Sequence, residues 1–174
     1  MTSHFADLMP DVEPLGPVSD FVNEFIDAVS PQPMFQGFSA QETALLSQYM
    51  ECFGVPRDST VLREGDEGDF LAILVTGKAV ILKAYDGVDK VVHELNTGEM
   101  FGEMSLIDGQ KRFATCVTTE PSDFAVLTRE RMDDMLADHP RLANKFLLML
   151  LSLSTSRLRH ATTYMLPGLM DESA

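Results

Sequence analysis

The sequence contains little cysteine, no tryptophan and few positive charges. Only two of its 174 residues are cysteines, Cys52 and Cys116, which lie far apart and outside any C-x-x-C pattern. We therefore expect neither a disulfide framework nor a zinc site, and we predict that both thiols are reduced and buried. Lysine and arginine number 13 against 27 aspartates and glutamates, which gives a formal net charge of -14. Because affinity for DNA rests largely on basic side chains, this balance argues against DNA and anionic lipid as partners.

Long hydrophobic runs are missing as well. No apolar run is longer than that from Phe146 to Leu151, which is far short of the ~20 residues that cross a bilayer. The first ten residues, MTSHFADLMP, have no basic n-region and no apolar h-region, so we do not expect them to be a signal peptide. Hydrophobic residues make up 45% of the chain, enough for one buried core. We predict a soluble, cytoplasmic, single-domain protein that does not bind a membrane.

The N-terminal third is predicted to hold an arm and two helices. Residues 1–17 contain three prolines and scattered acids, which is typical of a mobile or loosely draped arm. Apolar residues recur at helical spacing over residues 18–29, and a second helix is predicted over 40–49. The residues expected to cap them are Ser19 or Asp20 for the first helix, and Ser39 for the second, with Glu42 completing a capping box.

The middle of the chain has the pattern of an all-β unit. Seven glycines lie between positions 65 and 109 and separate short β-rich runs, as in a sandwich or barrel. In one run, Leu71, Ile73 and Val75 are expected to share one face of a strand, with Phe70 and Leu74 on the other. The predicted strands are 60–64, 70–75, 78–84, 90–95, 113–118 and 123–127.

Helical periodicity returns after Thr128. A short helix is predicted over 129–137 and a long one over 141–166, which at ~1.5 Å per residue spans ~39 Å. One stripe on the long helix has the 4-3-4 spacing of a coiled-coil seam. It predicts either a homodimer through this helix or packing of the stripe on the chain's own β-roll. The stripe consists of Leu147, Leu151, Ser154, Leu158, Ala161 and Met165.

Residues 101–117, FGEMSLIDGQKRFATCV, carry the groups that suit a phosphorylated ligand. Gly102 permits a close approach of the backbone, and residues 104–107 can form one helical turn with free N–H groups. Glu103 offers a carboxylate to sugar hydroxyls, and nine residues later Arg112 offers a planar cation to phosphate oxygens. A ligand that needs both is a nucleotide. The alternative is a structural ion pair between Glu103 and Arg112 across the loop.

These residues resemble the phosphate-binding cassette of cyclic-nucleotide-binding domains, the family of catabolite activator proteins and protein kinase A regulatory subunits. The family pattern F-G-E-(L/M)-(A/S)-L, a short loop and then an arginine before A-(T/S)-V is matched at 101–106 and 112–117. The resemblance extends through TVLREGD (60–66) and FLAILVTG (70–77) and covers residues 39–165. It implies an α+β fold, an antiparallel jelly-roll-like β-roll flanked by N-terminal helices and a long C-terminal helix.

The same resemblance implies a domain organisation and roles for single residues. Residues 1–38 would be an arm and a helix, 39–166 the nucleotide-binding domain with its long helix, and 167–174 a tail. Glu103 would accept the ribose 2′-OH, and Arg112 would bind the exocyclic oxygens of the cyclic phosphate. The remaining ligand contacts would be Gly102, Met104, Ser105, Phe113 and Ala114, with weaker candidates Val92 and Leu95 before the cassette and Arg157, His160, Ala161 and Thr162 on the long helix.

Two positions depart from the family pattern. Lys111 stands where proline usually precedes the arginine, and Phe113 stands where the family usually has Ala, Ser or Thr. The family's hydroxyl at the second position favours cGMP, so its absence favours cAMP. Phe113 also narrows the expected pocket or stacks near the base, which leaves base specificity open between cAMP and cGMP.

Catalysis and DNA reading are not predicted. The β-rich region holds a single histidine, His93, expected at the surface, so a cupin-like metal site cannot be assembled. The chain also has no G-x-S-x-G, Walker A or H-E-x-x-H motif, and we expect no metal or cofactor. DNA-binding relatives place a helix-turn-helix after the long helix, where this sequence has only MLPGLMDESA.

The sequence therefore predicts a receptor for cAMP, or for cGMP, that changes conformation on binding and regulates a partner protein. Two alternatives stay open. The chain is either an adaptor that retains the fold without binding a nucleotide, or a piece of a larger channel, transporter or regulator.

Overall fold

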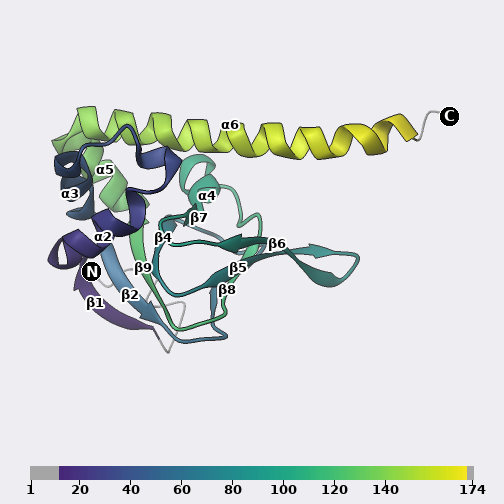
Figure 1. Ribbon diagram of the computed structural model, residues 1–174, viewed down its shortest axis with the longest axis horizontal. Coiled ribbons are helices and arrows are strands. Elements are labelled where there is room, and N and C mark those ends of the chain that lie inside the picture. The colour runs from purple at the N-terminus through teal and green to yellow at the C-terminus, as the bar shows by residue number, and fades with distance from the viewer. Residues whose placement is uncertain (1–11, 172–174) are drawn as a thin grey trace.

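The computed structural model describes residues 12–171, and their side chains as far as residue 160. Two antiparallel sheets form the body (Figure 1). One sheet has the order β1-β2-β9-β4-β7 and the other β3-β8-β5-β6. Their strands are β1 (Glu13–Pro17), β2 (Glu51–Val55), β9 (Ser122–Thr128), β4 (Phe70–Thr76), β7 (Met100–Phe101), β3 (Thr60–Leu62), β8 (Thr115–Thr118), β5 (Ala79–Tyr85) and β6 (Val88–Leu95).

Helices precede, interrupt and follow this roll. Figure 1 shows the N-terminal helices and α5 grouped at one end, with α6 running along the roll and projecting beyond it. The helices are η1 (Val18–Phe21), α2 (Val22–Val29), η2 (Pro33–Phe35), α3 (Ala40–Ser47), α4 (Glu103–Asp108), α5 (Arg129–Asp138) and α6 (Pro140–Asp171). The predicted fold class, an antiparallel β-roll with N-terminal helices and a long C-terminal helix, is confirmed. No helix among the described residues is long and apolar enough to cross a membrane.

Strand β4 separates two buried cores. Leu71, Ile73 and Val75 pack with the helices, and Phe70 and Leu74 pack toward the second sheet, as the alternation predicted. Because both faces are covered, every residue of β4 from Phe70 to Val75 is buried. This central strand therefore fixes the helices on one side of the first sheet and the roll on the other.

The N-terminal region differs from the prediction in two ways. The prediction that 1–17 forms a loose arm is wrong for its end, because residues 13–17 form β1 and pair with β2; residues 1–11 lie outside the described part. Neither Ser19 nor Asp20 caps α2, which follows the 3-10 turn η1 without a side-chain cap. Residues 13–17 are ordered by backbone pairing with β2, which could not be inferred from the proline content of the segment.

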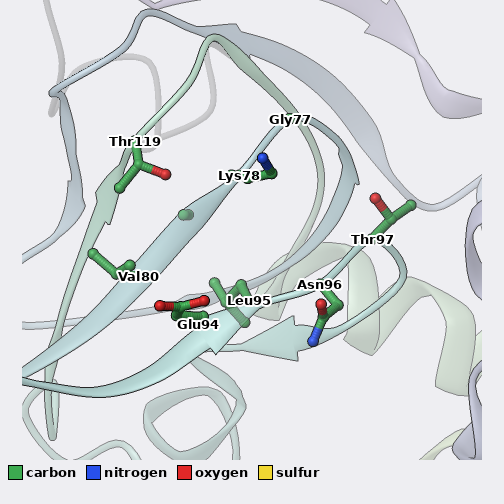
Figure 2. Close-up of a pocket in the computed structure, with 9 residues that line it drawn as sticks. Gly77, Lys78, Val80, Glu94, Leu95, Asn96, Thr97 and Thr119 are labelled. Carbon is green, nitrogen blue, oxygen red and sulfur yellow. The ribbon is translucent and has the colours of Figure 1, made fainter.

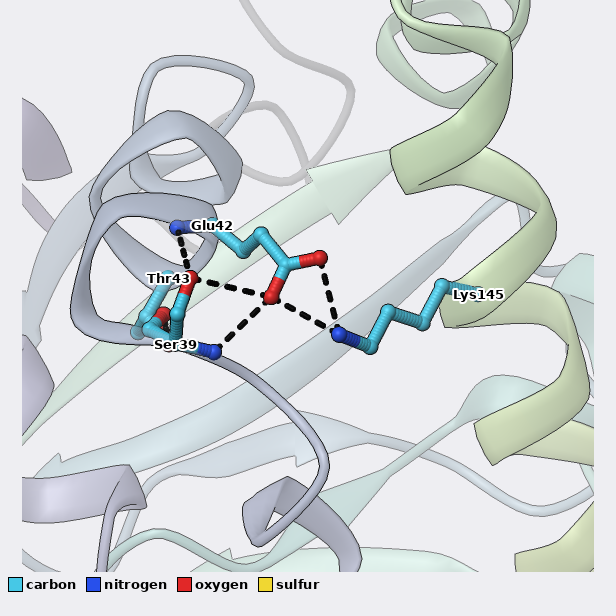
Figure 3. A network of polar contacts seen from close by, with 4 residues as sticks. All are labelled: Ser39, Glu42, Thr43 and Lys145. Atoms are coloured by element: carbon cyan, nitrogen blue, oxygen red, sulfur yellow. Dashed lines mark hydrogen bonds and ion pairs between the residues drawn. The ribbon is translucent and has the colours of Figure 1, made fainter.

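The capping box of α3 is confirmed, and it is extended by a residue of α6. Ser39 N–H donates to Glu42 Oε2 at 2.8 Å, and Glu42 N–H donates to Ser39 Oγ at 3.2 Å. Lys145 Nζ donates to both oxygens of Glu42, at 2.8 and 2.7 Å (Figure 3). This hydrogen bond, together with those of Ser39, lowers the pKa of Glu42 to about 2. The start of α6 is thereby fixed to the N-terminal helices.

The long helix α6 runs from Pro140 to Asp171, past the predicted end at residue 166 and into the predicted tail. Its apolar stripe divides between two environments. Leu147 packs against the helical core, whereas Leu151 and Leu158 are exposed. The side chains of Ala161 and Met165 lie outside the described part. Residues 155–160 are all exposed, and over this segment Arg157 contacts the cassette.

Candidate functional site

Arg112 is a buried cation with unused hydrogen-bonding capacity. Its side chain is 3% exposed and lies 4.2 Å, from Cζ to ring centroid, over Phe70. Nη1 donates to the carbonyls of Phe70 at 2.8 Å and Gly102 at 2.9 Å, while Nη2 is buried and has no partner. Burial lowers the pKa of Arg112 to about 10, opposed by Asp69 and Glu103, so it remains charged at neutral pH. A fixed guanidinium with one unused NH₂ group suits an anionic oxygen.

Two glycines leave the room that this guanidinium occupies. A Cβ at Gly68 would overlap Nε and Cζ of Arg112, and a Cβ at Gly102 would lie 2.9 Å from its Nη1. Gly102 also has a φ of +78°, which suits glycine, and it turns the chain from β7 into α4. Gly102 was predicted from the sequence. Gly68 was missed, because nothing in its local pattern indicates which side chain passes beside it.

The backbone on both sides of Arg112 is tied to the turn after β3. Gly65 N–H donates to the carbonyl of Arg112 at 2.9 Å, and Arg112 N–H donates to the carbonyl of Asp66 at 2.8 Å. Both backbone polar groups of Arg112 are therefore hydrogen-bonded to one neighbouring segment. The cation is fixed at its backbone as well as at its side chain.

Glu103 pairs with the long helix rather than with Arg112. Its carboxylate is 1% exposed, and its Oε1 accepts a hydrogen bond from Nη1 of Arg157 on α6. Nη2 of Arg157 donates to the carbonyl of Met100 at 2.9 Å, and the Arg157 side chain is 44% exposed. The alternative left open by the sequence, a structural pair between Glu103 and Arg112, is not formed, and Glu103 instead makes a pair that joins the cassette to α6. A carboxylate has two oxygens, so Oε2 can still accept a hydroxyl.

The other cassette residues surround α4 and the loop after it. The predicted helical turn is confirmed as α4, which begins at Glu103 and ends before Gly109, at a φ of +68°. Ser105 is buried and its carbonyl accepts from Nη2 of Arg129 at 2.9 Å, whereas Met104 is exposed. Ala114 is half-buried. Phe113 is 60% exposed, with Nζ of Lys83 lying 4.1 Å from its ring centroid.

Of the weaker candidates, Arg157 reaches the cassette, where it pairs with Glu103, and the others that the structure describes lie apart from it. Val92 is exposed on β6 and His160 is exposed on α6. Leu95 is buried and pairs with Ala79 at the start of β5. Phe113 lies near the other end of β5, where Lys83 binds its carbonyl, so Leu95 is distant from Phe113. The side chains of Ala161 and Thr162 lie outside the described part, so their roles stay predictions. His93 is half-exposed, and its Nε2 lies 2.7 Å from Oε2 of Glu99.

Leu95 instead lines a cavity of about 390 Å³ beside the start of β5 and the end of β6 (Figure 2). Lys78 borders this cavity, and its Nζ donates to Glu120 at 2.9 Å. The other lining residues are Gly77, Ala79, Val80, Glu94, Asn96, Thr97 and Thr119. None of the cassette residues contributes to it, so this cavity is separate from the site around Arg112.

The two cysteines are free and buried, as predicted. Burial raises the pKa of the Cys52 thiol to about 11 and raises that of Cys116 further. Burial therefore favours the thiol form of both, as expected for structural rather than reactive cysteines. Among the described residues, no cluster of three or more His, Cys, Asp or Glu side chains could hold a metal ion.

Comparisons with known proteins agree with this geometry. The family model for the cyclic nucleotide-binding domain matches residues 53–139. A CRP-like cAMP-activated global transcriptional regulator of Mycobacterium tuberculosis is 30% identical over 118 residues, 67% of this chain and 53% of that protein. A cAMP-dependent protein kinase regulatory subunit of Mycosarcoma maydis is 34% identical over 95 residues, 55% of this chain and 18% of that protein. The chain therefore spans about half, or less, of the length of these relatives.

Two solved structures are similar over most of the chain. A cyclic nucleotide-binding domain from Methylobacillus flagellatus KT has a TM-score of 0.84 and 36% identity, and the match covers 97% of this chain and 96% of that one. The catabolite activator protein of Thermus thermophilus has a TM-score of 0.69 and 29% identity, with 77% of this chain and 62% of that one covered. With the cassette at 101–117 lying inside the region that the family model matches, the chain belongs to the cyclic nucleotide-binding domain family.

Proposed function

We propose that this chain is a receptor for cAMP that regulates a partner protein and is not itself an enzyme. The observation that carries the proposal is Arg112, a buried cation whose Nη2 has no partner in the free protein. A buried polar group without a partner costs free energy, and the exocyclic oxygens of a cyclic phosphate would satisfy it. The Mycobacterium tuberculosis relative is described as cAMP-activated, which supports the same ligand here.

The ligand's sugar would meet Glu103. With Oε1 bound to Arg157, Oε2 would accept the ribose 2′-OH. The ligand and α6 would then share one carboxylate, which is how occupancy of the site would reach the long helix. Phe113 offers no side-chain hydroxyl to a base, which favours cAMP over cGMP.

We infer that α6 is also the surface that meets another protein, and that a second copy of this chain is its partner. Leu148 and Leu151 are 64% and 61% exposed, and with Thr155 and Leu158 they follow the 3-4-3 spacing of a coiled-coil seam. A seam with this spacing fits a helix of the same spacing, which a second copy supplies. The exposed stripe begins at Leu148, one residue after the predicted Leu147, which packs on its own core.

The alternative is an adaptor that binds no nucleotide. It is favoured by one observation, that Glu103 already has an internal partner in Arg157. It does not account for the unpaired Nη2 of Arg112, which has no use in an adaptor.

Calorimetric titration with cAMP, cGMP and a cyclic dinucleotide tests the proposal. Wild type should bind cAMP most tightly. Arg112→Ala should lose a charge-assisted contact of ~1.5–3 kcal/mol, roughly 10- to 150-fold in affinity. The matched control is Arg141→Ala, because Arg141 is exposed at the start of α6. This variant should bind cAMP with the affinity of wild type. If no cyclic nucleotide binds wild type below millimolar concentration, the adaptor takes the place of the receptor.

A further inference from the structure

The peptide that follows Arg112 is held by a lysine from another strand. Nζ of Lys83, on β5, donates to the carbonyl of Phe113 at 2.6 Å and lies over the face of the Phe113 ring. The same Nζ donates to Oε1 of Glu64 at 2.6 Å. One ammonium group thus contacts the backbone and the side chain of the residue next to the proposed phosphate ligand.

Glu64 is in turn held by the backbone of Ala84 and the side chain of Thr115. Its Oε2 accepts from Ala84 N–H at 3.1 Å, and its own N–H donates to Oγ1 of Thr115 at 3.0 Å. The hydrogen bond from Lys83, followed by that from Ala84, lowers the pKa of Glu64, so the carboxylate is charged at neutral pH. Both oxygens are used, and the Lys83–Glu64 pair is anchored in the sheet rather than extended into water.

Sheet order explains why these residues meet. Strands β3, β8 and β5 are neighbours, and the end of β3, the start of β8 and the end of β5 lie at one edge of the sheet. Glu64 follows β3, Lys83 lies near the end of β5, and the loop that carries Arg112 enters β8. The turn after β3 binds the Arg112 peptide through Gly65 and Asp66, and Lys83 binds the next carbonyl.

We propose that Lys83, held by Glu64, is a positioning residue for phosphate recognition. This inference rests on the proposed function. The bond from Lys83 to the Phe113 carbonyl completes the backbone bonds that Gly65 and Asp66 make to Arg112, and so fixes the segment that carries the guanidinium. Lys83 therefore governs how strictly the site distinguishes the two exocyclic oxygens of a cyclic phosphate. Lys83 acts through the backbone of Phe113, and Glu64 acts through Lys83.

The two phosphorothioate diastereomers of cAMP test this role, because each replaces a different exocyclic oxygen with sulfur. Calorimetry should show that wild type binds one diastereomer more tightly than the other. Lys83→Met should weaken cAMP binding about 10-fold, the loss of one charge-assisted hydrogen bond, and bring the affinity ratio of the diastereomers toward one. Lys83→Arg should restore both. The matched control, Lys78→Met, breaks the surface pair with Glu120 and should change neither.

Hydrogen exchange of the free protein gives a readout that needs no ligand. Lys83→Met should speed amide exchange in the peptide spanning residues 112–116, and Lys78→Met should not. If Lys83→Met does not fold, Glu64→Gln, which removes the charge that holds Lys83, should speed the same exchange and reduce the same ratio.

The possible failures can be told apart. Unchanged exchange, or full affinity and full discrimination in Lys83→Met with a wild type that binds, would overturn the role of Lys83 alone. A wild type that binds neither diastereomer nor cAMP would overturn the proposed function, and the role in phosphate recognition with it.

Discussion

The pair between Glu103 and Arg157 allows a double-mutant cycle whose outcome the structure sets in advance. Arg157→Met leaves a carboxylate that is 1% exposed without its cation, whereas Glu103→Gln leaves an arginine that is 44% exposed and can turn to water. The first change should therefore cost about 1.5–3 kcal/mol of unfolding free energy, the worth of a charged hydrogen bond. The second should cost about 1 kcal/mol or less, as for an exposed ion pair.

The double variant should be less destabilised than the sum of the two single variants. Replacing both partners removes the buried charge together with its counter-ion, so we expect a coupling energy of about 1–2 kcal/mol. Urea unfolding followed by far-UV circular dichroism measures it, since the chain has no tryptophan for fluorescence. In a chain of this length each kcal/mol also lowers Tm by about 2–4 °C.

Additive effects of the two substitutions would refute the reasoning, because they would mean that the pair contributes nothing in solution. Binding supplies a second comparison. If Arg157 keeps Glu103 oriented toward a ribose hydroxyl, Arg157→Met should weaken cAMP binding by about 3- to 10-fold. A variant with unchanged affinity would show that α6 and the ligand do not share this carboxylate.

Three further outcomes follow from single contacts. Gly68→Ala should weaken cAMP binding by at least about 10-fold in calorimetry, because its Cβ displaces the guanidinium of Arg112; normal affinity would contradict the geometry. Leu151→Asp should shift the chain to monomer in analytical ultracentrifugation, while the adjacent exposed Ser152→Asp should not, and equal sedimentation of all three proteins would exclude dimerisation through this seam. Glu42→Gln should lower the unfolding free energy by up to about 1 kcal/mol at pH 7. Since the pKa of Glu42 is lowered to about 2, its contribution is full above pH 4.5 and is lost as the pH falls toward 2; a Glu42→Gln deficit that is the same at pH 2 and pH 7 would contradict this.

The fold was predictable where local chemistry and long-range packing agree. The capping box at Ser39 and Glu42 and the two faces of β4 follow from spacing alone, and both are confirmed. Strand β1 was not predictable, because it forms only by pairing with β2, some 35 residues away along the chain. Two of its five residues are also prolines, which do not favour a strand. The two-residue strand β7 is likewise defined by its partner β4 rather than by its sequence.

The candidate site divides in the same way. The motif predicted Gly102, Glu103 and Arg112, because the chemistry of these residue types suits a nucleotide whatever the rest of the fold. Arg157 was predicted as a weaker candidate for contacting the ligand, but its pairing with Glu103 was not, because the two residues lie 54 positions apart and the register of Arg157 on α6 depends on where that helix packs. Gly68 and Lys83 gave no signal at all. Each acts through Arg112 or its neighbour across strands, and only the sheet order brings them there.

The contacts of α6 set a limit on how a ligand could act. The helix is fixed at Lys145, which binds Glu42 of the N-terminal helices, and again at Arg157, which binds Glu103 of the cassette. Twelve residues, or about 18 Å of helix, separate the two contacts. A ligand shifts an equilibrium only through groups whose interactions it changes, and of these two contacts only the one at Glu103 includes a residue of the proposed site. The first contact can therefore serve as a fixed point, and any response of α6 to the ligand should begin at Arg157. Leu148, Leu151 and Thr155 of the exposed seam lie between the two contacts, so the seam is part of the segment that would respond.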